Sequence, residues 1–239
     1  TGGKIWGEVS ESFLSTLKNN LSAGGKTYRP VSLWINWPVT DNSKQHLILG
    51  GGEKFLHPNV DPSLLSGIML NPMQQSEPSK IALFAGAQYT WKQWKSEEEA
   101  KKLNDIAFNF VENGHFEDSK VSAAFRELGK HMINQNMDGR VVKLEESVEL
   151  APKLTDFMTK LKAGQDVTAE RATLRAEFAK IKEAAELYKA SGDKKMVAQI
   201  HYWLDNAIDQ MNALDAFLTG TEAMATNDAA KLWDSYYKG

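Results

Sequence analysis

The sequence predicts a chain of two structural classes, an α/β first part followed by a mainly α second part. Residues 1–91 contain six of the seven prolines, ten of the 17 glycines and several short β-rich runs. Residues 92–239 contain one proline and show apolar residues at helical spacing. We therefore expect an α/β domain over residues 1–92 and an all-α helical bundle domain over residues 93–239.

The first part predicts helices and strands in alternation. Apolar spacing indicates a helix over Ile5–Leu21, which Gly24-Gly25 ends. Two short β-rich runs follow at Pro30–Trp37 and Gly67–Asn71, each closed by a proline. A mostly apolar helix is expected over Ser79–Trp91. Strands and helices in this order are typical of parallel βα units.

Two βα units are too few to form a stable sheet by themselves. A complete (β/α)8 TIM barrel needs roughly 250 residues, and the first part supplies about a third of one. We therefore expect the last βα units of a TIM barrel, with the rest of the barrel supplied by an N-terminal part of the same protein or by a partner.

The second part predicts successive amphipathic helices. Ser96-Glu-Glu-Glu99 is a capping box that opens a helix ended by Asn113-Gly114. Further helices are expected near Glu117–Ile133, Ala151–Lys162, Thr168–Ala190 and Asp193–Leu218, with a short last helix around Trp233. Packing of these apolar stripes against one another explains them without any ligand.

Charge and residue usage argue against several functions. The net charge of −3 gives no basic surface for nucleic acid or an anionic membrane. The absence of cysteine excludes disulfides, a thiol nucleophile and a thiolate zinc site. The five histidines lack ligand spacing, so we expect neither a metal nor a cofactor. The longest apolar runs are too short for a membrane span.

The most unusual segment is Trp34-Ile-Asn-Trp-Pro-Val-Thr-Asp41. It places Trp34, Asn36 and Asp41 at or just past the carboxyl end of a predicted parallel strand, and Asn71 ends the next strand. Active sites of βα barrels lie at that edge, and an aromatic ring, amides and a carboxylate suit a sugar. The residues alone leave a second interpretation equally open, in which Asn36 and Asn71 are turn residues and Asp41 caps a helix.

Several segments, in order, resemble glycoside hydrolase family 84. Trp34–Asp41 and the following run to Gly50 are similar to the family's W-W-N-F/W-P-V-x-D…H-L-L-L-G. Ser66–Met73 and Glu77–Leu83 resemble its S-G-F-x-x-N-P-M…E-x-S-K-I-A, and Thr1-Gly2 resembles the end of its W-T-G. The resemblance is ordered over residues 1–94 and weaker in the helical part. Family members are secreted bacterial β-N-acetylglucosaminidases, some known as hyaluronidases, and O-GlcNAcases.

The resemblance implies part of a retaining exo-β-N-acetylglucosaminidase that removes terminal N-acetylglucosamine (GlcNAc) from glycans or glycoproteins. In this family the acetamido oxygen of the sugar attacks C1 to give an oxazoline, and two adjacent aspartates perform the acid-base steps. The sequence contains no Asp-Asp pair. The catalytic residues are therefore expected upstream of Thr1, in the N-terminal part of the same enzyme, and this chain alone is expected to be inactive.

Carried over position by position, the resemblance implies four sugar-binding residues. Trp34 would line the acetamide pocket, and Asn36 would hydrogen-bond near the reacting centre. Asp41 would accept hydrogen bonds from the 4- and 6-hydroxyls, and Asn71 would bind the 3- or 4-hydroxyl. The resemblance also implies a secreted or cell-surface bacterial location. The alternative function is a non-catalytic helical interaction or spacer module of a larger secreted protein.

Overall fold

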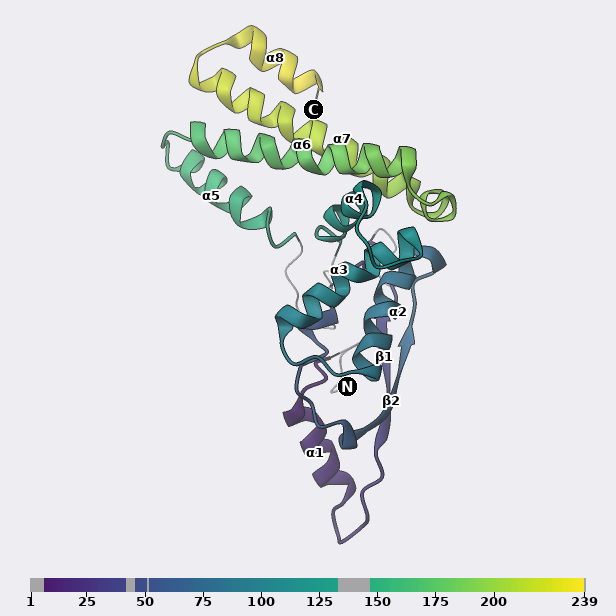
Figure 1. The fold of residues 1–239 in the computed structure, drawn as a ribbon. Helices are drawn as coiled ribbons and strands as arrows, with labels where there is room; N and C mark the ends of the chain where they lie inside the picture. Colours follow the sequence, from purple (N-terminus) through teal and green to yellow (C-terminus); the bar gives the residue numbers. More distant parts are fainter. Residues whose placement is uncertain (1–6, 42–45, 51, 133–146, 239) are drawn as a thin grey trace. The chain divides into compact units, whose positions relative to one another are not determined.

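The computed structural model describes residues 7–41, 46–50, 52–132 and 147–238 (Figure 1). Contacts divide the chain into two compact units, residues 1–146 (unit 1) and 147–239 (unit 2). Unit 1 contains α1 (Glu11–Leu21), β1 (Val31–Pro38), η1 (Gly52–Lys54), η2 (Pro62–Leu64), β2 (Leu65–Asn71), α2 (Ser76–Trp91), α3 (Glu97–Asn113) and α4 (Lys120–Gly129). Unit 2 contains α5 (Ala151–Lys162), α6 (Thr168–Ser191), α7 (Lys194–Ala225) and α8 (Ala229–Lys238).

Both predicted strands are present and pair in parallel. Trp34 lies beside Met69 and Ile35 beside Leu70, and within the described residues these two strands form the whole sheet. Helix α2 packs on one face of the sheet. Gly86 permits this close approach, because a Cβ atom there would lie 2.4 Å from the Leu70 Cδ1 atom. The opposite face, which carries Trp34, is exposed.

The helix expected over residues 5–21 begins later, at Glu11. The Ser10 hydroxyl caps it by accepting a hydrogen bond from the Phe13 amide at 3.3 Å. Before this cap the chain is extended, and Val9 forms a parallel bridge with Leu56. At Val9 a β-type pairing with a distant segment therefore takes the place of the predicted helix, and Ile5 and Trp6 lie outside the described residues.

The core of unit 1 extends beyond the expected domain boundary. Helix α3 packs against α2 and α4 packs against α3, so both helices belong to unit 1. The compact units therefore divide after residue 146 and not near residue 92, because aromatic pairs continue across the change in sequence texture. Tyr89 and Trp94 meet edge to face across this change at a centroid distance of 5.0 Å. Similar pairs lie on either side of it, Trp37–Phe55 at 4.9 Å and Phe108–Phe125 at 5.1 Å.

Unit 2 is built from helices whose apolar stripes meet one another, as the sequence predicted. Helix α6 packs against both α5 and α7, and α8 packs against α7. Phe157, Tyr188 and Leu204 are at most 1% exposed and lie in its core. Helix α7 extends beyond the expected end at Leu218, to Ala225. In the ranges that the structure describes, no helix is both long and apolar enough to cross a membrane.

Candidate functional site

Three of the four predicted sugar-binding residues lie in one hydrogen-bonded cluster at the carboxyl end of the sheet. The Trp34 Nε1 atom donates to the Asn36 Oδ1 atom at 2.7 Å, and the Asn71 Nδ2 atom donates to the same oxygen at 3.2 Å. The backbone joins the strands at the same level, because the Val39 amide donates to the Asn71 carbonyl at 2.9 Å. We call Trp34, Asn36 and Asn71 the strand-end cluster.

The chemistry of Trp34 fixes the polarity of the strand-end cluster. An indole nitrogen can only donate, so the Asn36 atom that it meets is the carbonyl oxygen. The two donors occupy both lone pairs of this oxygen, so Asn36 can only donate outward, through Nδ2. Asn71 donates to Asn36 through its Nδ2 atom, and its own Oδ1 atom remains available as an acceptor. The cluster therefore offers a donor at Asn36 and an acceptor at Asn71.

The cluster lies on the exposed face of the sheet. Trp34 is 59% exposed and its neighbour Met69 is 51% exposed. Ile35 points to the opposite, buried face. The sequence pattern alone does not single out Met69 as a candidate contact of a ligand. Met69 could be placed beside Trp34 only from the register of the two strands. That register shifts between Val31 and Ser32, so simple alternation along the sequence does not predict it.

Asn36 and Asn71 do not fit the alternative in which both are turn residues. Asn36 lies inside β1, and Asn71 is the last residue of β2. Asp41 is exposed and follows the same strand end as Asn36. Residues 42–45, which would form the start of a helix capped by Asp41, lie outside the described residues, as do Thr1 and Gly2. Binding of a ligand by Asp41 stays a prediction.

The loop after Asn71 is tied to the start of α2. The Ser79 hydroxyl donates to the Gln75 carbonyl at 2.7 Å and accepts from the Met73 amide at 3.0 Å. The Met73 sulfur in turn accepts from the Ile48 amide at 3.3 Å. Ser79 is 1% exposed, so these bonds are shielded from water. They hold the backbone that follows Asn71 and thereby position its side chain.

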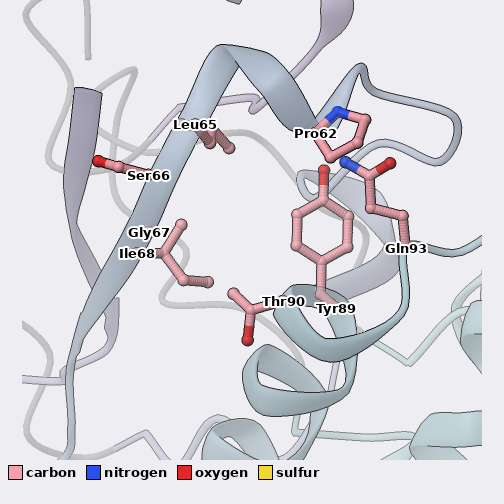
Figure 2. A pocket seen from close by; sticks show the side chains of 8 residues that line it. All are labelled: Pro62, Leu65, Ser66, Gly67, Ile68, Tyr89, Thr90 and Gln93. Carbon is pink, nitrogen blue, oxygen red and sulfur yellow. The ribbon is translucent and has the colours of Figure 1, made fainter. Parts of the chain in front are cut away.

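Two further kinds of site can be assessed. Among the described residues, no group of three or more His, Asp or Glu side chains is arranged to hold a metal ion. A pocket of about 130 Å³ lies at the other end of β2, away from the strand-end cluster (Figure 2). Its lining residues are Pro62, Leu65, Ser66, Gly67, Ile68, Tyr89, Thr90 and Gln93.

The hydroxyl groups of Tyr89 and Ser66, which line this pocket, already form hydrogen bonds within the protein. Tyr89 donates to the His57 carbonyl at 2.9 Å, and burial, with the Glu11 charge, raises its pKa to about 12. Figure 2 shows Ser66 turned away from Tyr89, and its hydroxyl lies 3.0 Å from that of Ser32. The pocket is also smaller than the roughly 300–1,000 Å³ of typical ligand sites. The strand-end cluster is therefore the better candidate site.

Comparison with known families gives two matches, one for each unit. A β-N-acetylglucosaminidase model matches residues 1–130, and a model described as hyaluronidase post-catalytic domain-like matches residues 149–239. The first model alone covers more than half of the chain. The two matches follow each other in the order of units 1 and 2.

Three solved structures are similar to the chain over almost its whole length. CpGH84D has a TM-score of 0.81 and 25% identity, covering 98% of this chain and 36% of its own. CpGH84B has a TM-score of 0.78 and 21% identity, covering 98% and 38%. A mutant of the Thermobaculum terrenum O-GlcNAc hydrolase has a TM-score of 0.68 and 20% identity, covering 97% and 46%. The chain thus spans less than half the length of each structure.

Proposed function

Because the chain belongs to glycoside hydrolase family 84, whose catalytic domain is the β-N-acetylglucosaminidase domain, we propose that it is part of a retaining exo-β-N-acetylglucosaminidase. The enzyme would remove terminal GlcNAc from glycans or glycoproteins. In this proposal β1 and β2 are the last strands of a TIM barrel, and the catalytic aspartate pair lies in an N-terminal part of the same enzyme. The chain supplies sugar-binding residues, and its isolated form is inactive.

The reaction in this proposal is substrate-assisted. The acetamido oxygen attacks C1 while the glycosidic bond breaks, and one aspartate of the pair gives a proton to the leaving oxygen. The other aspartate holds the acetamide N–H. The aspartate that gave its proton then takes one from water as that water attacks C1. The bond between C1 and the acetamido oxygen breaks, which restores the acetamide and retains the configuration. This chain contributes positioning of the sugar to both steps.

The single observation that carries the proposal is the polarity of the strand-end cluster. Asn36, with its oxygen occupied, is suited to donate to a carboxylate or to the acetamide oxygen. Asn71, with its oxygen available, is suited to accept from a sugar hydroxyl. Trp34 is held by its indole nitrogen, which leaves the ring surface to form the wall of the acetamide pocket. Asp41 completes the site by accepting from the 4- and 6-hydroxyls.

The exposed sheet face supports the idea that more of the barrel covers it. Trp34 and Met69 are more than half exposed on a face that a complete barrel would enclose. A two-stranded parallel sheet also lacks partners at both outer edges within the described residues. An N-terminal part of the same enzyme is therefore the proposed intramolecular partner. GlcNAc-terminated glycans or glycoproteins are the proposed substrates, and a secreted or cell-surface location stays a prediction.

The test is hydrolysis of a chromogenic β-N-acetylglucosaminide by the complete enzyme and by residues 1–239 alone. We expect activity only from the complete enzyme, and about a 100-fold loss of kcat/KM for Asn36→Ala, because its donor acts near the reacting centre. Ser66→Ala, at the amino end of β2, is the matched control and should keep full activity. Hydrolysis by residues 1–239 alone, or full activity of Asn36→Ala, would contradict the proposal. Full activity of Asn36→Ala would favour the alternative of a non-catalytic module, whereas hydrolysis by residues 1–239 alone would show that the catalytic groups lie within this chain.

A further inference from the structure

Helix α8 presents its aromatic face to solvent. Trp233, Tyr236 and Tyr237 are 62%, 73% and 79% exposed. Their spacing of three and four residues places them on one face of the helix. The residue of α8 that is buried is Ser235, at 6% exposure, and it lies on the side that packs against α7. This order is the reverse of an ordinary amphipathic helix, which buries its large apolar side chains.

The contact between α7 and α8 explains why the aromatic residues stay outside. Gly220 of α7 faces α8, and a Cβ atom there would lie 3.0 Å from the Ser235 Oγ atom and 3.7 Å from the Leu232 Cδ1 atom. Such a close approach leaves room for serine but not for an aromatic ring. The small residues Gly220 and Ser235 therefore set the rotation of α8 and hold its aromatic face outward.

The three rings touch one another and form a continuous surface, which we call the α8 platform. The Trp233 and Tyr237 rings are 6.1 Å apart between centroids and inclined by 24°. Tyr236 meets Trp233 at 6.2 Å and Tyr237 at 5.5 Å, each edge to face. Besides their apolar ring surfaces, the three side chains carry an indole N–H and two phenol hydroxyls. This combination can pack on the C–H face of a pyranose and hydrogen-bond its hydroxyls.

The charges beside the α8 platform are balanced. Lys231 pairs with Glu222 at 2.8 Å, and Lys238 pairs with Asp234 at 2.5 Å. Each nearby ammonium group therefore has a carboxylate partner. A surface for anionic lipid or nucleic acid needs an excess of positive charge, which these pairs remove. The platform is suited to an uncharged ligand.

The size of the α8 platform also favours a sugar over a protein partner. Three aromatic side chains at these exposures present on the order of 500 Å² together. A standard protein–protein interface takes about 800 Å² from each partner. The platform falls short of that area but can accommodate one or two sugar rings.

We propose that the α8 platform is a second, non-catalytic binding surface for uncharged glycans built from β-linked hexopyranoses. Trp233 and Tyr237 would stack on sugar rings, and Tyr236 would contribute its edge and hydroxyl. This binding needs no hydrolysis and does not depend on the strand-end cluster. It would keep the protein on its glycan while terminal sugars are removed elsewhere.

The test is calorimetric titration of residues 1–239 with the β-1,4-linked GlcNAc hexamer. We expect a Kd on the order of 1 mM, typical of a weak site with few contacts. The double variant Trp233→Ala/Tyr237→Ala should raise Kd at least tenfold. Trp91→Ala is the matched control, because Trp91 is 92% exposed in unit 1 and should not affect binding.

Three results would overturn the proposal: no binding by the unaltered chain, equal binding by the double variant, or tighter binding of a hyaluronan oligomer than of the neutral hexamer. Light scattering adds a fourth, a dimer that the double variant dissociates without any change in glycan binding. Circular dichroism checks the fold of the double variant. If that variant unfolds, Trp233→Phe with amide chemical-shift mapping takes its place, and hexamer-induced shifts confined to residues outside α8 would equally reject the platform.

Discussion

The two units use their aromatic residues in different ways. Unit 1 buries Trp37, Tyr89 and Trp94 in its core and exposes Trp34 on the open face of a two-stranded sheet. Unit 2 buries Tyr188 among its paired helices and exposes Trp233 on the outside of α8. Within the described residues, no element covers the exposed sheet face of unit 1. The exposed residues of unit 2, in contrast, lie on the outer side of helices that already pack against one another.

This difference separates residues for binding from residues for stability. Within unit 1, the strand-end cluster lies on a face that contributes little burial, so its side chains are available for a ligand. Within unit 2, the apolar stripes of the helices pack against one another and are not available for a ligand. Changes at the sheet face should therefore affect activity more than stability, and changes in the helical core should do the reverse.

The largest effect is expected at Asp41. In the complete enzyme, Asp41→Ala should lower kcat/KM by on the order of 10²–10³, because the sugar hydroxyls would lose a charged hydrogen-bond acceptor. The side chain is exposed in this chain, so the free energy of unfolding should stay within about 0.5 kcal/mol of its original value. Steady-state kinetics and thermal unfolding measure the two quantities. Full activity of Asp41→Ala would remove Asp41 from the site.

The next largest effect is expected on the stability of the helical core of unit 2. Leu204→Ala removes a fully buried side chain from α7 and should destabilise unit 2 by about 2–5 kcal/mol. Met224→Ala on the same helix is the matched control, because Met224 is 65% exposed and should change stability little. Calorimetry follows unfolding, and a Leu204→Ala protein as stable as the control would show that the α7 stripe is not a core.

The sequence predicted the strands and helices well where the signals were local. Asn36 and Asn71 could be placed at strand ends because proline closes each β-rich run. The Ser96 cap and the helix end before Gly114 were also readable, and both are present. For the same reason α5 occupies the range predicted for it.

Features that depend on distant contacts could not be predicted. Val9 continues a helical pattern but pairs with Leu56, 47 positions away along the numbering, as a β-bridge. The shared hydrogen bonds of Asn36 require the register of β1 against β2, which shifts between Ile35 and Pro38. The unit boundary depends on α2 packing against α3, as where Phe84 meets Phe110, whereas composition reports only the kind of secondary structure. Each miss is a case of tertiary pairing overriding a local pattern.

Helix caps give a smaller effect and test whether the two units unfold independently. Ser96→Ala removes the hydroxyl that accepts from the Glu99 amide at 3.1 Å in unit 1. Asp193→Ala removes the carboxylate that accepts from the Lys195 and Met196 amides at 3.0 Å in unit 2. Each should cost about 1 kcal/mol. Hydrogen exchange should show the loss only in the unit that carries the change, and equal losses in both would mean that the units unfold together.

The smallest effect concerns pH and the exposed ion pairs of unit 2. Hydrogen bonding and charge from Lys231, followed by Arg175, lower the pKa of Glu222 below its usual value of 4.5. A carboxyl group with a lowered folded-state pKa contributes stability above its unfolded-state pKa and loses it as the pH falls through the folded-state pKa. Glu222→Gln should therefore weaken the pH dependence of unit 2 stability below about pH 4.5.

The change at Glu222 should be slight, because 36% of its side chain is exposed and water screens the charges of its partners. Thermal unfolding at pH 3 and pH 7 gives the measurement, with Glu98→Gln in unit 1 as the matched control, since Lys102 likewise lowers the pKa of Glu98. If the packing of its helices is sufficient to hold unit 2 together, both variants should lose only a small and similar part of the pH dependence of stability. A large loss confined to Glu222→Gln would mean that its pairs with Lys231 and Arg175 hold α6, α7 and α8 together, and that the packing of small residues between α7 and α8 is not sufficient.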